Sequence, residues 1–132
     1  DEKGPARTWQ AAFLKFGVGY HMAREELLEA AFHWPTMYEY ESSLVDGWPK
    51  SKPIEEFKAA WIGEFVAQSK RRTRAETDDL LKMTLATGRP EEKGPERLIF
   101  HAHANFGGGQ ARSYHFRRIE GIWFLVRMED TQ

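Results

Sequence analysis

The last third of the chain contains three apolar segments separated by turn signals, and this pattern constrains the fold more than any other feature. The segments are RLIFHAHANF (97–106), ARSYHFRRIE (111–120) and IWFLVRMED (122–130). Each is rich in the β-branched and aromatic residues that favour strands. Glu120-Gly121 separates the last two, and glycine supplies the positive φ that a tight hairpin needs. The sequence therefore predicts an antiparallel meander, with a longer hairpin at GGGQ (107–110).

Helical periodicity precedes this meander. In ARTWQAAFLKF (6–16), Thr8 can cap a helix whose inner stripe is Trp9, Phe13 and Phe16. Two glycines in GVGY (17–20) are expected to interrupt it, because glycine disfavours helix. A second helix follows within 21–32. The clearest helix is SKPIEEFKAAWIGEFVAQSKRR (51–72), with Ser51 as its cap and Pro53 in its first turn.

Two segments are harder to interpret. HWPTMYEYESSL (33–44) is expected to be a strand, and Pro35 confines it to a strand start or a sheet edge. Within TRAETDDLLKMTLATG (73–88), Thr73 and Glu76 form a capping box and favour a helix. The alternation of Leu81, Met83 and Leu85 favours a strand instead, and we expect a strand over 80–87.

The resulting order of elements predicts an α+β fold, in which helices segregate to one side of an antiparallel sheet. A length of 132 residues suits a single domain spanning 1–132. Hydrophobic residues make up 41% and charged residues 30%, as in globular proteins. No run reaches the roughly 18 apolar residues of a membrane-spanning helix.

Charge and cysteine content exclude several classes of function. The net charge of −1 provides no basic field for nucleic acid, and the local cluster Lys70, Arg71, Arg72 and Arg74 is expected to be a solvated helix end. The absence of cysteine excludes disulfides, thiolate zinc sites, iron–sulfur clusters and thiol nucleophiles. No phosphate loop or nucleophile elbow occurs, so hydrolysis by a serine nucleophile is not expected.

Three histidines lie around the GGG turn. If Phe106 faces Gln110, then His101 lies opposite His115, and His103 shares their face of the sheet. Directly opposed residues have Cβ atoms roughly 4.5–5.5 Å apart, so three imidazoles could converge. Three histidines could ligate a metal, but no Asp or Glu lies in the strand beside them to orient them. That face also carries Ile99, Phe124, Val126 and Met128, while Phe100, Ala102, Ala104, Tyr114, Phe116 and Leu125 form a core face.

The histidine face therefore has three interpretations: a metal site, a ligand pocket lined by histidines, and ordinary surface histidines. A pocket without a metal or cofactor is preferred over the metal site. Aromatic residues provide a further candidate surface, because Trp34, Tyr38 and Trp48 lie near one loop and such residues anchor protein partners.

A catalytic alternative needs an imidazole or carboxylate in a water-poor pocket, with its pKa moved toward the working pH. The candidates are Tyr20, His21, His33, Tyr38, Asp46, His101, His103 and His115. None of the serines of the chain has a recognisable triad setting. The acidic residues fall on predicted helix faces or loops.

The chain resembles the nuclear-transport-factor-2-like superfamily, whose fold is the cystatin-like α+β roll. The resemblance rests on AAFHWPTMYEYES, KSKPIEEFKAAWIGEF and above all ARSYHFRRIEGIWFLVRMED. It implies a curved sheet around a long helix, a cone-shaped pocket and an exposed sheet face that serves as a dimer surface. Members include SnoaL-like cyclases, isomerases and dehydratases as well as non-catalytic binding modules, and a fold alone does not choose among them. No Asp here matches the catalytic pattern of the enzymatic members.

The preferred interpretation is a non-catalytic binding module that holds a small apolar ligand or a protein partner, in an accessory or immunity role. Its predicted site residues are His101, His103, His115, Trp34, Tyr38 and Trp48. The alternative is a SnoaL-like enzyme with a histidine base. The polar start DEKGPARTW, with Asp rather than Met first, favours an exported or periplasmic protein, and a cytoplasmic location stays open.

Overall fold

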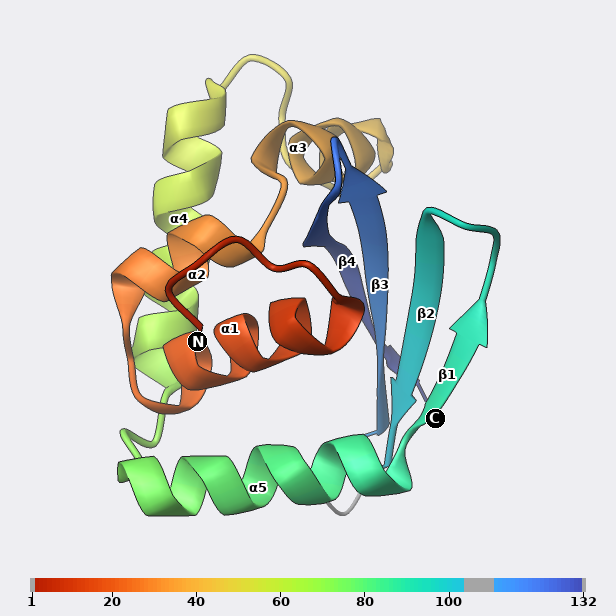
Figure 1. Ribbon diagram of the computed structural model, residues 1–132. Helices are drawn as coiled ribbons and strands as arrows, with labels where there is room; N and C mark the ends of the chain where they lie inside the picture. The colour runs from red at the N-terminus through yellow and green to blue at the C-terminus, as the bar shows by residue number, and fades with distance from the viewer. Residues whose placement is uncertain (1, 104–110, 132) are drawn as a thin grey trace.

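The computed structural model describes residues 2–103 and 111–131 and contains five helices and four strands within them. The helices are α1 (Trp9–His21), α2 (Glu25–Ala31), α3 (Trp34–Ser43), α4 (Ile54–Gln68) and α5 (Arg74–Thr87). The strands are β1 (Arg89–Glu92), β2 (Arg97–Ala102), β3 (Ala111–Ile119) and β4 (Ile122–Thr131). Figure 1 shows the helices gathered beside a single sheet. The α+β class is confirmed. No helix in the described ranges has the length and apolar character needed to cross a bilayer.

The four strands form an antiparallel meander in the order β1-β2-β3-β4. The predicted hairpin between β3 and β4 is confirmed: Glu120 and Gly121 have φ values of 51° and 80°, as a two-residue turn with both φ positive requires. The proposed pairing of Phe106 with Gln110 lies outside the described residues.

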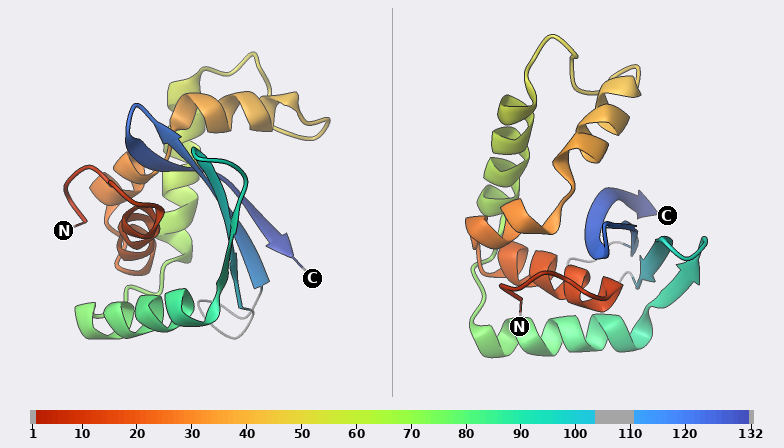
Figure 2. Two further views of the ribbon diagram at one scale, coloured as in Figure 1. Left: turned by 45° about the vertical axis from the view of Figure 1, so that its right-hand side comes forward. Right: turned by 45° about the horizontal axis from the view of Figure 1, so that its top comes forward.

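The sheet has two faces of different character. The inner face, which packs on the helices, carries Leu98, Phe100, Ala102, Phe116 and Leu125, all at most 8% exposed. The outer face carries Ile99, His101, Ser113 and His115, because alternate side chains point to opposite sides. Figure 2 shows α1, α4 and α5 on one side of the sheet, with α3 crossing its end.

Aromatic side chains of α1 form the centre of the core. The Trp9 and Phe13 rings lie 5.0 and 5.2 Å from the ring of Phe100, and the Phe13 ring lies 5.1 Å from Tyr114. Phe16 continues this stripe onto Phe65 of α4. The predicted stripe of Trp9, Phe13 and Phe16 is therefore the contact that joins the helices to the inner face.

A β-bulge breaks the regular pairing of β3 with β4. His115 pairs with Arg127 while Phe116 pairs with Leu125, so Val126 is an extra residue in β4. As a result Met128, opposite Tyr114, lies on the inner face, and its predicted place on the histidine face is wrong.

GVGY does not interrupt the first helix, which continues to His21. A Cβ on Gly17 would lie 2.4 Å from Cδ2 of Leu81, and one on Gly19 would lie 3.0 Å from the backbone nitrogen of Leu28. These glycines therefore allow α5 and α2 to approach α1 closely. That gain offsets the low helix propensity of glycine.

The segment 33–44, predicted as a strand, is instead α3 (Trp34–Ser43) with His33 and Leu44 as its caps. Trp34 and Met37 are buried at helical spacing, and Pro35 lies in the first turn, where its missing N–H is not needed. Residues 80–87 are likewise helical, as part of α5, whose capping box at Thr73 and Glu76 is present. Met83 is 50% exposed, so the alternating pattern that favoured a strand does not bury a face.

The long helix is present, but it is shorter than the predicted range of 51–72. It begins at Ile54 with Pro53 as N-cap, so the predicted cap at Ser51 is wrong, and it ends at Gln68. The basic residues 70–72 belong to the connection to α5, where Arg71 has a φ of 50°.

Candidate functional site

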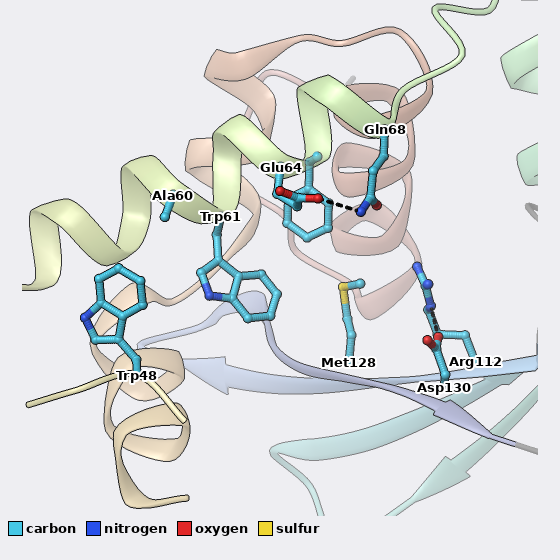
Figure 3. Close-up of a pocket in the computed structure, with 9 residues that line it drawn as sticks. Trp48, Ala60, Trp61, Glu64, Gln68, Arg112, Met128 and Asp130 are labelled. Atoms are coloured by element: carbon cyan, nitrogen blue, oxygen red, sulfur yellow. Dashed lines mark hydrogen bonds and ion pairs between the residues drawn. The ribbon is translucent and has the colours of Figure 1, made fainter. Parts of the chain in front are cut away.

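The inner pocket lies between α4 and the C-terminal half of β4, and its cavity volume is about 380 Å³. In Figure 3, two tryptophans stand side by side at one end and an ion pair lies at the other. The lining residues are Trp48, Ala60, Trp61, Glu64, Phe65, Gln68, Arg112, Met128 and Asp130.

The apolar wall comes from the spacing of α4. Trp61 and Phe65 are one helical turn apart, and their rings lie 5.8 Å from each other. Trp48 enters from the preceding loop, with its ring 5.5 Å from the buried ring of Phe57. Met128 faces these rings from the sheet (Figure 3). Trp48, Trp61, Phe65 and Met128 form the apolar wall at the tryptophan end of the pocket.

The polar end is a pair of opposite charges on adjacent strands. Arg112 and Asp130 are direct cross-strand partners, and the Nε of Arg112 donates to Oδ1 of Asp130 at 2.8 Å. Burial raises the pKa of the neighbouring Tyr114, against the opposing effect of the positive charge of Arg112. On the rim, Gln68 donates to Glu64 at 3.0 Å. The pocket thus joins an apolar wall to one fixed ion pair.

The three predicted aromatic site residues are separated by the structure. Trp48 lines the inner pocket. Trp34 is 7% exposed and donates from Nε1 to the carbonyl of Glu29 at 2.9 Å. Tyr38 donates to the carbonyl of Lys52 at 2.8 Å and packs on Phe57. The Trp34 contact joins α3 to α2, and the Tyr38 contact holds the loop that follows α3.

The histidines lie in a different register from the predicted one. His101 pairs with Ser113 and His115 with Ile99, a slip of two residues that keeps both histidines on the outer face but removes their direct opposition. His103 follows β2 and is exposed. Within 2–103 and 111–131, no three His, Asp or Glu side chains are placed to hold a metal ion. The facing-histidine register behind the metal interpretation is therefore wrong.

Each sheet histidine contacts a glutamate from a neighbouring strand, which the sequence argument did not foresee. Nε2 of His101 lies 2.8 Å from Oε1 of Glu91, and Nδ1 lies 2.9 Å from Oγ of Ser113. Nε2 of His115 lies 2.6 Å from Oε1 of Glu129. Hydrogen bonds from Lys93 and then His101 lower the pKa of Glu91 to about 2.

The Glu91–His101–Ser113 line has the composition of a hydrolytic triad. Ser113, however, is only 3% exposed, so its hydroxyl is not presented to a substrate. The line therefore functions as a cross-strand hydrogen-bond chain.

The remaining acid–base candidates are scattered. Burial, and next the charge of Arg72, lowers the pKa of His21 to about 4. Burial and then Arg117 lower the pKa of His33. Asp46 lies in the exposed loop before α4, and Tyr20 stacks on Phe16. None of these residues lines the inner pocket.

Sequence reasoning missed most of the inner pocket. Arg112 and Asp130 could have been found, because with β3 and β4 joined by a two-residue turn they fall opposite each other once one bulge is allowed. Trp61, Phe65 and Met128 carry the same sequence signal as core residues. Comparison with protein families, with curated proteins and with solved structures finds no match to this chain.

Proposed function

We propose that this protein is a non-catalytic binding module whose inner pocket holds one small molecule with a flat apolar body and a polar head. The observation that carries the proposal is the arrangement in Figure 3: an aromatic wall at one end of a cavity of about 380 Å³ and a single ion pair at the other. Small-molecule pockets combine a mainly apolar lining with a few placed polar groups in this way.

The aromatic wall favours a flat ligand. Trp48 and Trp61 offer ring faces and edges, and Met128 offers a polarisable surface that adapts to the shape of its partner. Lys52 already lies over the Trp48 ring at 5.2 Å, which is the distance of a cation–π contact.

The Arg112–Asp130 pair supplies the specificity for the head group. The guanidinium retains donors beyond the Nε that Asp130 uses, and the carboxylate retains acceptor positions. A head group placed there meets a donor and an acceptor whose positions are set by the sheet register.

A histidine-based proton transfer is the other function expected from the sequence. No histidine is among the described residues that line the inner pocket, and His101 and His115 lie on the opposite face of the sheet. The lining therefore favours binding over that chemistry.

The proposal is compatible with the α+β roll of the superfamily that the chain resembles, in which a pocket lies between a long helix and a curved sheet. A pocket between α4 and β3–β4 supports that assignment. The helical state of 34–43 removes the support that this segment lent to it.

The test is an NMR titration with three probes that share one ring system: 2-naphthoate, 2-naphthylmethanol and 2-naphthylmethylamine. We expect saturable shifts of the Trp48 and Trp61 indole N–H signals with at least one probe. The Trp34 indole, bonded to a backbone carbonyl, serves as the internal reference. The preferred probe identifies the charge of the head group.

The matched variants are Ala60→Phe and Ala59→Phe. Both alanines are exposed on α4, but only Ala60 lines the pocket. Ala60→Phe should abolish the shifts and Ala59→Phe should preserve them. Equal loss in both variants, or no saturable shift with any probe, would contradict the proposal.

A further inference from the structure

Three cationic side chains stand in a row across the outer face of the sheet. Arg97 of β2 and Arg117 of β3 are direct cross-strand partners. Lys93, which follows β1, donates its backbone N–H to the carbonyl of Arg97 at 3.0 Å. Neighbouring strands are about 4.8 Å apart, and like charges placed directly opposite each other are destabilising. Arg97 is exposed and Arg117 is half-buried, so the sheet register holds two like charges side by side at the surface, where an anion that contacts both is stabilised.

No carboxylate in the described part of the chain supplies that anion to the two arginines. Across residues 2–103 and 111–131, neither Arg97 nor Arg117 forms an ion pair, whereas the adjacent Arg118 has Glu96 at 3.6 Å. Lys93 is paired, with its Nζ 2.8 Å from Oε2 of Glu91.

The nearby carboxylates on this face are already occupied by other bases. Glu91 also accepts from His101 at 2.8 Å. Glu129 contacts His115 at 2.6 Å and Arg127 at 2.7 Å. The positive charge of Arg117 also extends to His33 at the start of α3, where it adds to burial in lowering the pKa of that histidine.

The three cations border a cavity of about 360 Å³. Thr36 of α3 and His115 line it as well, and Ile99 and Val126 form an apolar part of its wall. No Asp or Glu is among the described residues that line it. The Thr36 hydroxyl lies 2.7 Å from Nδ1 of His33, which fixes its position.

We propose that this outer cavity binds the phosphate group of a small phosphomonoester between Arg97 and Arg117. Each guanidinium presents a planar fork of N–H donors that matches phosphate oxygens in a bidentate manner. Two uncompensated guanidinium charges match a phosphate that carries close to two negative charges at neutral pH. The apolar body of the ester lies on Ile99 and Val126. This site is on the opposite face from the inner pocket and is independent of the function proposed for it.

The test is isothermal titration calorimetry of the whole chain with phenyl phosphate and with inorganic phosphate, at low ionic strength. Benzoate, which has the same ring and one negative charge, is the comparison ligand. We expect one-to-one binding of phenyl phosphate, weaker binding of benzoate, and displacement of phenyl phosphate by inorganic phosphate. Phenyl phosphate binding more tightly than inorganic phosphate assigns the site to an ester, and equal binding assigns it to the free ion.

The variants are Arg97→Gln and Arg117→Gln, with Arg118→Gln as the matched control. All three remove one positive charge, but Arg118 contacts Glu96 and lies 5.9 Å from the Trp123 ring instead of lining the cavity. Each of the first two should weaken phenyl phosphate binding about tenfold or more, as loss of a charged hydrogen bond does, and the control should change it less than twofold.

Circular dichroism of each variant confirms that it is folded before titration. Three results would overturn the proposal: no saturable heat with phenyl phosphate, equal affinity for benzoate, or equal weakening in Arg117→Gln and Arg118→Gln.

Discussion

Each face of the sheet carries a pair of charged residues that lie directly opposite each other on neighbouring strands. The two charges of the inner pair attract, and those of the outer pair repel. On the inner face, Arg112 lies opposite Asp130 and the two side chains bond to each other. On the outer face, Arg97 lies opposite Arg117 and neither finds a carboxylate among the described residues. The first pair is satisfied within the protein, and the second has no carboxylate partner in residues 2–103 and 111–131.

The contrast shows that a pair of charged side chains on a sheet can either stabilise the fold or remain available to a ligand. A satisfied pair contributes to the fold, and under the proposed function it would orient the ligand of the inner pocket. An opposed like-charge pair lowers stability, and its charges stay available to a ligand. Like-charge pairs are among the arrangements that cluster at functional sites.

The largest expected effect contrasts the two faces at adjacent residues of β2. Phe100→Ala should lower the free energy of unfolding by about 3–5 kcal/mol, because its fully buried ring packs on Trp9 and Phe13. Ile99→Ala, on the half-buried outer side, should cost about 1 kcal/mol. Urea denaturation measures both. Similar losses would mean that the outer face is covered as fully as the inner one.

The second-largest expected effect is a pH dependence of stability that comes from the buried His21 and not from the hydrogen-bonded histidines of the outer face. The folded-state pKa of His21 is about 4, below its unfolded value of 6.5, so its contribution to stability is full above pH 6.5 and is lost as the pH falls to about 4. The loss amounts to roughly 3 kcal/mol at about 1.4 kcal/mol per pKa unit.

Denaturation at pH 7 and pH 4.5 tests this dependence in His21→Phe, which fills the same site without titrating. The variant should lose most of the drop, and the control His101→Gln should retain it. A wild-type slope in His21→Phe would assign the acid sensitivity elsewhere.

The smallest effects have opposite signs in the two charged pairs. Asp130→Asn should destabilise the unliganded protein, and Arg117→Gln should stabilise it, each by about 0.2–1 kcal/mol, the range of cross-strand pairs. Thermal unfolding at low ionic strength resolves the two shifts, and high salt should reduce both. Two shifts of the same sign would remove the contrast on which the comparison rests.

The fold could be predicted where local pattern and tertiary packing agree. The three C-terminal strands, the Glu120-Gly121 turn, the Thr8 cap and the Thr73–Glu76 capping box were all expected from the sequence and are present. The predicted strands at 33–44 and 80–87 are wrong because aromatic and β-branched content and alternation were given more weight than helical spacing. That spacing buries Trp34 and Met37 in α3. In α5 it buries Thr77, Leu81 and Thr84.

The candidate site was less accessible to prediction for a geometric reason. The faces of His101 and His115 follow from alternation alone, but their neighbours depend on register, which a slip of two residues changes. Glu91 and Glu129 reach the histidines diagonally from neighbouring strands. Trp48 was predicted as a site residue without its pocket, because the other walls come from α4 and β4.

The bulge in β4 gives that strand one residue more than its pairing requires. Leu125, Arg127 and Met128 each have a partner in β3, and Val126 has none, although it forms part of the wall of the outer cavity. Deletion of Val126 would leave the order of inward and outward residues unchanged on both sides of the cut. A one-residue deletion inside a strand ordinarily reverses every side chain beyond it. Here the shortened protein should fold and keep the inner pocket, and only the outer cavity should change. A change in chain length at this position can therefore alter one site without altering the other.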